Sequence, residues 1–492
     1  MTSLTISPAS AAPEMRKRPM TSLGALRALG WLCILASVSV LAFLYRDSIL
    51  WSIVAPLIAA IAIVVGFLLY LRGIEGTVPY FEFGAFYIAL AGLYATYPIL
   101  KYVLQGYRYD VGDQRILTLQ NYPFALGILE WWHVLYLISF CVAYALVRGR
   151  RAVQGRLRVT RPDWPMVASV LVLLTGAKLF FVVLGIFYDL RVGTYLESYL
   201  VIQRLPLFAR QIAAQVQGIG LTLQIMLVVA LTCARQTGFR VLLVVFLVLT
   251  TLSHLVLPGG RIELVAVVLS ALAAHHLAVR RIQLRWLVMA GVAGFFVMIL
   301  MGVVRTDRAF GEFEPGRVFE RMAEENTEFE VIFGNAIELK YWREEGGIFL
   351  DKPNLYWSGL FAVIPQQILP LEKDTPWAWF TRSYYPEYFE MGGGMAFGIL
   401  AEAVAGYGWP EMLWRGAVVG LLFGLLHRLL YRPKVSPYLF MFYIWLMVWS
   451  YLTLRSSTFA PLMLILYRFV APLVAIMVLS VLLRRVRRSI RA

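Results

Sequence analysis

The chain has few charged residues and few cysteines for its length. Only 15% of its 492 residues are Asp, Glu, Lys or Arg, and there are three cysteines. Cys33, Cys141 and Cys233 all fall inside apolar segments, so the sequence predicts neither a disulfide framework nor a thiolate metal site. The scarcity of charge, together with a hydrophobic content of 60%, excludes an ordinary soluble globular protein.

Apolar segments long enough to cross a membrane recur along most of the chain. A bilayer core about 30 Å thick takes roughly 20 apolar residues per helix. The sequence therefore predicts an all-α integral membrane protein with about 12 transmembrane helices, at residues 29–45, 49–71, 81–103, 126–147, 165–187, 211–233, 240–257, 262–279, 286–304, 411–431, 437–452 and 459–483. The first segment lacks a small-residue cleavage site, so we expect it to remain as an uncleaved helix.

The formal net charge of +16 comes from Lys and Arg residues whose distribution among the loops indicates the membrane topology. With the N-terminus in the cytoplasm, the loops and tails on that side hold 24 Lys and Arg residues, and the short loops on the other side hold 8. This bias predicts that both termini are cytoplasmic. The basic stretch 148–151 and the tail 484–491 are expected to contact anionic membrane lipids, and no nucleic acid partner is needed to explain the charge.

The predicted organisation has six parts. A basic cytoplasmic tail (1–28) precedes nine transmembrane helices (29–304), a large extracytoplasmic loop (305–394), an apolar segment (395–409), three more transmembrane helices (411–483) and a basic tail (484–492). A helix over 395–409 is only about 22 Å long, too short to span. If it crossed, the cluster from Arg428 to Lys434 would lie outside. We therefore expect a re-entrant or interfacial helix that carries Glu402 into an outward-facing cavity.

Arginine and aromatic residues gather on the predicted outer face. Guanidinium groups bind phosphate oxygens in a two-pronged geometry, and tyrosine and tryptophan rings suit sugars. We therefore expect a phospho-glycolipid site with Glu402 and Arg382 as catalytic residues. The candidate substrate-binding residues are Arg204, Arg210, Arg261, Arg305, Arg455, Tyr384 and Tyr385.

Each of these residues also has a structural interpretation. Arg261 and Arg305 lie near helix ends, where an arginine often extends to the membrane interface. Arg382 has Glu387 and Glu390 nearby as ion-pair partners, and the aromatic residues are compatible with an interfacial belt. A structural pairing of Glu402 with Arg415 or Arg455 is the alternative to a catalytic role. Glu130 and His133, one helical turn apart near the start of a span, fit a solvated position better than a proton relay.

The order of these features resembles the bacterial oligosaccharide repeat-unit polymerases, which belong with the O-antigen polymerase and ligase type of membrane glycosyltransferases. The resemblance rests on the number of spans, a Gly-Gly-Arg hairpin at 259–261 and a large outer loop late in the chain. It rests most of all on the glycine-rich run 392–394 leading to Glu402, followed by Gly-Tyr-Gly at 406–408.

This resemblance implies a GT-C-like architecture in the bacterial cytoplasmic membrane. The implied reaction moves a growing glycan from polyprenyl pyrophosphate onto the non-reducing end of an incoming lipid-linked repeat unit. It also implies a separate chain-length regulator as a partner. Arginines stabilise a pyrophosphate leaving group without a metal, and the sequence has no Asp-x-Asp or His-Glu-x-x-His motif, so we expect no cofactor.

Two other functions remain open at this stage. A ligase that transfers glycan to another acceptor would share the site and differ only in the acceptor. A transporter or flippase of lipid-linked sugars would instead need two gated halves, and the absence of an internal repeat argues against it.

Overall fold

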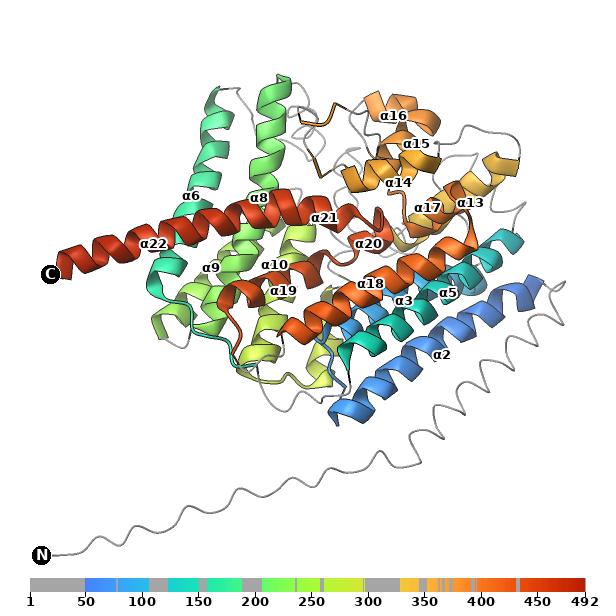
Figure 1. Ribbon diagram of the computed structural model, residues 1–492, viewed down its shortest axis with the longest axis horizontal. Coiled ribbons are helices and arrows are strands. Elements are labelled where there is room, and N and C mark those ends of the chain that lie inside the picture. The colour runs from blue at the N-terminus through green and yellow to red at the C-terminus, as the bar shows by residue number, and fades with distance from the viewer. Residues whose placement is uncertain are drawn as a thin grey trace, which may run out of the picture.

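The computed structural model describes residues 49–76, 78–105, 123–149, 157–187, 206–234, 237–256, 261–294, 296, 328–344, 352–361, 363–364, 368–370, 375–390, 394, 396–430 and 434–491, which we call the described residues. Their regular structure is helical, apart from one isolated parallel bridge between Val159 and Val435 (Figure 1). The prediction of an all-α protein is confirmed for this part of the chain.

Among the described residues, eight helices are long and apolar enough to cross a membrane, which supports a multi-pass membrane protein. They cover Trp51–Glu75, Phe83–Leu100, Ala125–Arg148, Trp164–Leu184, Gln215–Cys233, Trp409–Leu430, Pro437–Arg455 and Ala460–Ile490. Shorter apolar helices cover Thr237–Leu249, Leu264–Val279 and Leu284–Gly294, and they overlap three of the other predicted spans. The predicted span 29–45 lies outside the described residues, and the total of about 12 stays a prediction.

Four helices form one bundle: α2 (Ile49–Glu75), α3 (Phe83–Gln105), α5 (Pro123–Arg148) and α18 (Trp409–Leu430) (Figure 1). Glycines let α18 pack directly on the backbone of α5. A Cβ atom at Gly416 or Gly420 would lie 2.5 Å from the carbonyl oxygen of Tyr136 or Phe140, and one at Gly424 would lie 3.1 Å from that of Tyr144. Because residue numbers increase in the same direction along both helices at these contacts, α5 and α18 run parallel.

A second group contains α6 (Trp164–Phe187), α8 (Leu207–Cys233), α9 (Thr237–Val256), α10 (Arg261–Ala274) and the π-helix η1 (His275–Val279). Helix α19 (Pro437–Trp449) joins the two groups, since it contacts α8 and α10 on one side and α3 and α18 on the other. Its start is fixed by Ser436, whose side chain accepts a hydrogen bond from the Leu439 amide at 3.1 Å, and by Pro437 in the first turn.

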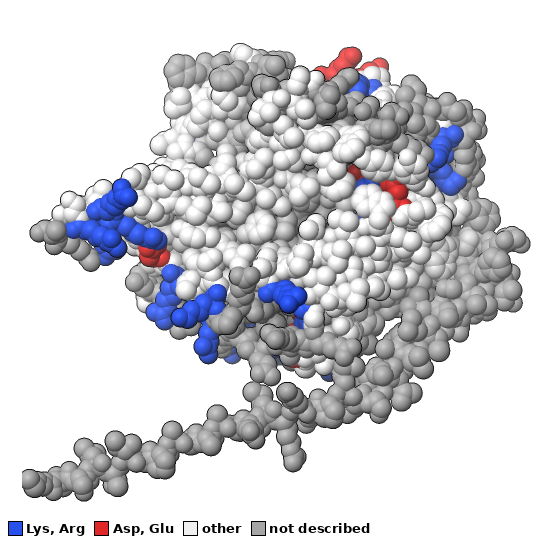
Figure 2. All heavy atoms as spheres, in the orientation of Figure 1, with Lys and Arg blue, Asp and Glu red and all other residues white. Residues whose placement is uncertain are grey.

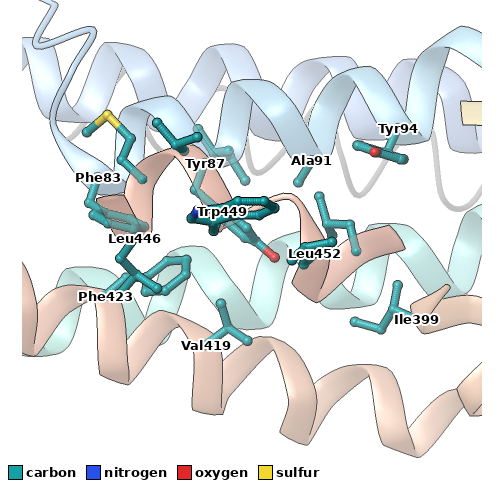
Figure 3. Packing of buried hydrophobic residues seen from close by; sticks show 14 of the residues in the cluster. Phe83, Tyr87, Ala91, Tyr94, Ile399, Val419, Phe423, Leu446, Trp449 and Leu452 are labelled. Carbon is teal, nitrogen blue, oxygen red and sulfur yellow. The ribbon is translucent and has the colours of Figure 1, made fainter. Parts of the chain in front are cut away.

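The apolar core lies where α3, α18 and α19 meet. Figure 3 shows Phe83, Tyr87 and Ala91 of α3 beside Val419 and Phe423 of α18, with Leu446 and Trp449 of α19 between them. The rings of Phe83 and Phe423 are 4.2 Å apart between centroids. Since exposed apolar side chains cover the outward faces of the helices, including Leu69, Leu93, Val142 and Leu422, the exterior suits a lipid environment.

The last predicted span is not one regular helix. It consists of α21 (Ala460–Leu464), a π-helix η3 (Ile465–Val470) and α22 (Ala471–Arg491). Helix α22 packs against α6 and carries five arginines near its C-terminal end, at 484, 485, 487, 488 and 491. In Figure 2 basic residues gather at this end, others lie along the lower edge and at the right, and much of the face between them is uncharged.

Helices also form within the predicted loop 305–394. They are α13 (Glu328–Glu344), α14 (Lys352–Phe361), α15 (Pro376–Tyr384) and α16 (Pro386–Glu390), and they lie together beside α17 (Ile399–Ala405) in Figure 1. Helix α13 packs against α17 and against α3 and α5. These helices therefore form a layer over one end of the first bundle.

Candidate functional site

Helix α17 is short and enclosed by protein. All seven of its residues are buried, including Glu402. Gly398 precedes it with φ of +85°, and Gly408 follows with φ of +83°, values at which a residue with a Cβ is strained. A side chain at Gly398 would also overlap Ile332 of α13. The predicted fifteen-residue helix is thus a seven-residue helix between two glycine turns, and whether it re-enters the membrane stays a prediction.

Glu402 is held from two sides. Its Oε2 atom accepts hydrogen bonds from Arg415 Nη1 at 2.5 Å and from the Thr458 amide and hydroxyl, both at 3.1 Å. Arg415 Nη1 also donates to Thr458 Oγ1 at 2.7 Å. The carboxylate therefore joins α17 to α18 and to the turn after α20 (Leu452–Arg455).

A second carboxylate shares the same arginine. Arg415 donates from Nε and Nη2 to Glu411 Oε2 at 3.0 and 2.7 Å, one helical turn earlier on α18. The other oxygen of Glu411 accepts hydrogen bonds from the Tyr407 amide at 2.6 Å and from the Tyr356 hydroxyl. A Cβ atom at Gly406 would overlap Glu411 Oε1, so this position needs glycine. The cluster of Glu402, Glu411 and Arg415 is what we call the carboxylate cluster.

The surroundings of the carboxylate cluster set its electrostatics. Burial raises the pKa of the Glu402 carboxyl, Arg415 and the Thr458 hydrogen bonds lower it, and Glu411 raises it further. The Arg415 guanidinium lies 4.6 Å from the ring centroid of Trp414. Arg343 of α13 donates to the Val404 carbonyl oxygen at 2.7 Å, which satisfies the C-terminal end of α17. Two carboxylates face one guanidinium here, so the cluster carries excess negative charge when both are ionised.

The aromatic residues of α15 and α16 are placed beside this cluster by α13. The Tyr385 hydroxyl donates to both oxygens of Glu338 at 2.8 and 2.7 Å. Tyr384 packs against the rings of Trp342, Trp379 and Phe380. Partial burial and the nearby Glu338 raise the pKa of the Tyr384 hydroxyl to about 12. Both tyrosines thus have fixed ring orientations.

The two remaining described candidates lie on different elements. Arg382 is exposed on α15. Arg455 ends α20, is partly buried, and lies three residues before Thr458, which binds Glu402. The neighbouring Ser456 carbonyl oxygen accepts from the Gly398 amide at 3.3 Å, so this turn is fastened to the start of α17.

The other predicted arginines cannot be placed as side chains. Arg204 and Arg305 lie outside the described residues. Arg210 lies on α8 and Arg261 begins α10, but their side chains are not described. Convergence of these arginines on one anion therefore stays a prediction.

Sequence reasoning did not count Glu411 and Arg415 among the site residues. Arg415 was considered only as a structural partner of Glu402, and it is indeed the residue that pairs with it. The available signal was a Glu and an Arg four residues apart in the first turns of an apolar span, where charges are costly unless paired.

Glu130 and His133 differ from the expectation. The structure buries both side chains, at 0% and 2% exposure, instead of leaving them in solvent. No hydrogen-bond partner for their polar atoms is found in the described part of the chain. His133 lies against Phe333 of α13, because α13 covers this end of the bundle.

Comparison with known proteins does not identify a family for this chain. No protein-family model matches the chain. No curated protein and no solved structure matches it either.

Proposed function

We propose that this chain is a membrane glycosyltransferase that polymerises lipid-linked oligosaccharide repeat units at the outer face of the bacterial cytoplasmic membrane. One observation carries the proposal. A carboxylate on a non-spanning, enclosed helix is held in position by Arg415 and Thr458, where the spanning bundle meets the aromatic helices α13–α16. A charge buried at such a boundary is costly, and functional sites commonly contain one.

The proposed reaction exchanges one glycosidic bond for another. The hydroxyl at the non-reducing end of the incoming repeat unit attacks the anomeric carbon of the growing glycan. The bond from that carbon to the polyprenyl pyrophosphate breaks, and the pyrophosphate leaves with the electron pair. The hydroxyl proton passes to Glu402, whose raised pKa makes it a better base than an exposed glutamate.

Arg415 has a positioning role in this proposal. Its contacts to Glu402 and Glu411 fix the direction of the Glu402 carboxylate before substrate arrives. Preorganised groups of this kind lower the barrier because they need no reorganisation during reaction. In this proposal Arg382 and Arg455 bind the leaving pyrophosphate, and Tyr384 and Tyr385 offer ring faces to the sugars.

The test compares surface polysaccharide from cells that carry Glu402→Gln or Arg382→Ala. We expect long chains to disappear while single repeat units accumulate on lipid. Glu387→Gln, an exposed acid on α16, and Arg158→Ala, an exposed arginine between α5 and α6, are matched controls that should keep normal chains. Membrane levels of every variant are compared with the parent.

The same experiment separates the competing functions. Loss of outward delivery of the single units would indicate transport instead. Normal long chains that are no longer attached to their final acceptor would indicate a ligase. Unchanged glycan in both site variants, at parental protein levels, would refute the assignment of the site.

A further inference from the structure

Arg468 lies within the last candidate span, well inside its ends. The span covers Ala460–Ile490, and Arg468 is about 12 Å along it at 1.5 Å per residue. It lies in the π-helix η3, and π-helical turns within α-helices often occur at functional sites because they redirect side chains. A cation at this depth is costly and normally has a partner.

The packing leaves room for the Arg468 side chain against α8. A Cβ atom at Gly218 would lie 2.5 Å from Arg468 Nε, 2.7 Å from its Cδ and 2.9 Å from its Cζ. The Arg468 side chain therefore lies directly against the α8 backbone at Gly218, and a Cβ atom there would displace it. Gly218 itself is buried.

The guanidinium of Arg468, which is partly buried, differs from those of the two buried arginines. Arg415 meets Glu402 and Glu411, and Arg148 meets Glu75 and Glu82. For Arg468 the described residues supply no carboxylate and no hydrogen-bond acceptor, and its one electrostatic neighbour is Tyr451. The positive charge is thus uncompensated within the described fold.

Tyr451 connects this position to the carboxylate cluster. Its carbonyl oxygen accepts from the Arg455 amide at 2.9 Å, and Thr458, which binds Glu402, lies three residues farther on. Tyr451, whose charge interacts with that of Arg468, and Thr458, which binds Glu402, therefore stand at the two ends of one short segment, residues 451–458.

We propose that Arg468, lying against Gly218, binds the diphosphate of the polyprenyl-linked donor. This inference rests on the proposed function and adds a binding residue that the outer loop does not contain. A guanidinium presents several N–H donors that match phosphate oxygens. The lipid tail lies among the spans, the diphosphate at η3, and the first sugar toward Glu402. An ordinary phospholipid headgroup carries the same phosphate chemistry, so the binding test includes phosphatidylglycerol as a competitor.

Binding is measured on the full chain in phosphatidylcholine nanodiscs by native mass spectrometry, with a polyprenyl diphosphate that carries no sugar as the probe. We expect Arg468→Gln to bind the probe about 10- to 100-fold more weakly than the parent. Arg468→Lys should retain part of the affinity, since it keeps the charge and loses the two-pronged geometry. Gly218→Ala should weaken binding through displacement of the side chain, and Gly66→Ala, with open space around it, should not.

A thermal unfolding series without the probe separates binding from a structural role. Removal of an uncompensated, partly buried charge should leave the unfolding temperature of Arg468→Gln equal to or higher than that of the parent. A lower temperature would show that Arg468 has a structural partner and would overturn the proposal.

The binding outcomes are also distinct. Equal binding by the parent and by Arg468→Gln would overturn the role of Arg468 and leave the polymerase proposal intact. Competition by phosphatidylglycerol at equal mole fraction would show an ordinary headgroup site and overturn the diphosphate assignment. Absence of probe binding by the parent would contradict both proposals.

Discussion

Arg148 of α5 donates from Nη2 to Glu82 Oε2 at 3.0 Å, in the interior of the first helix bundle. Glu82 also accepts a hydrogen bond from the Tyr144 hydroxyl at 2.9 Å, and Arg148 also pairs with Glu75. His427 of α18 lies near the same carboxylate, with Nδ1 3.9 Å from Glu82 Oε1. Four helix ends therefore meet at one buried cluster of charged and polar side chains centred on Arg148.

Removal of one partner from this pair is expected to destabilise the fold strongly. Arg148→Gln leaves Glu82 buried without its cation, and such a change costs about 3–5 kcal/mol. We expect a clear drop in thermal unfolding temperature in detergent. Arg484→Gln is the control, because its ion pair with Asp163 is nearly half exposed and should matter little. Equal unfolding temperatures for the two variants would contradict this prediction.

Gly420 is expected to be intolerant of a side chain. A methyl group there would meet the Phe140 carbonyl oxygen at 2.5 Å and force α18 away from α5. Overpacking of this kind costs about 1–3 kcal/mol. Gly176→Ala on α6, which has no neighbour within 4 Å, should be neutral or slightly stabilising because alanine favours helix. Unfolding curves of the two variants, measured side by side, check the prediction.

The pH dependence of polymerisation should report Glu402. Burial raises the pKa of its carboxyl, and the base must be deprotonated to accept a proton. As the pH is lowered, the rate is therefore expected to begin falling at a pH above the ordinary Glu pKa of about 4.3. Initial rates in proteoliposomes across the acid range test this. In Glu387→Gln the rate should fall over the same pH range as in the parent. A parental rate that falls only at or below the ordinary Glu pKa would argue against Glu402 as the base.

The proposed topology predicts opposite labelling at two exposed positions. In a chain whose three cysteines are replaced by serine, Glu387→Cys on α16 should react with a membrane-impermeant maleimide in intact cells. Arg158→Cys, between α5 and α6, should react only after permeabilisation. The reverse pattern would invert the orientation, and labelling of both in intact cells would contradict the assignment of the positively charged side to the cytoplasm.

Much of the helix pattern was predictable because hydrophobic length determines it. The predicted span 49–71 lies within α2, and 411–431 nearly matches α18. The π-helix at Ile465–Val470 was not predicted, since apolar composition does not reveal a local change in helix register. The burial of Glu130 and His133 was missed for another reason: it depends on coverage by α13, a helix nearly two hundred residues away in sequence.

The pairing of Glu402 was predicted in part. The single carboxylate of an apolar segment identified Glu402 as unusual, and the cost of burying it indicated a cationic partner. The sequence left Arg415 and Arg455 as alternatives, because the choice depends on how α17 packs against α18 and α20. The hydrogen bonds from Tyr356 and Tyr407 to Glu411 depend on loop geometry that residue spacing does not encode.

The parallel packing of α5 and α18 constrains how the chain between them can vary. Two parallel spans enter the bilayer from the same side, so the residues from 149 to 408 must cross it an odd number of times. Two long candidate spans and three shorter apolar helices lie in this interval among the described residues, and the requirement is met if all five cross. Gain or loss of a single crossing there would reverse the orientation of α18 across the membrane and remove its glycines from the α5 backbone. Insertions in this region are therefore compatible with the fold only in pairs of spans.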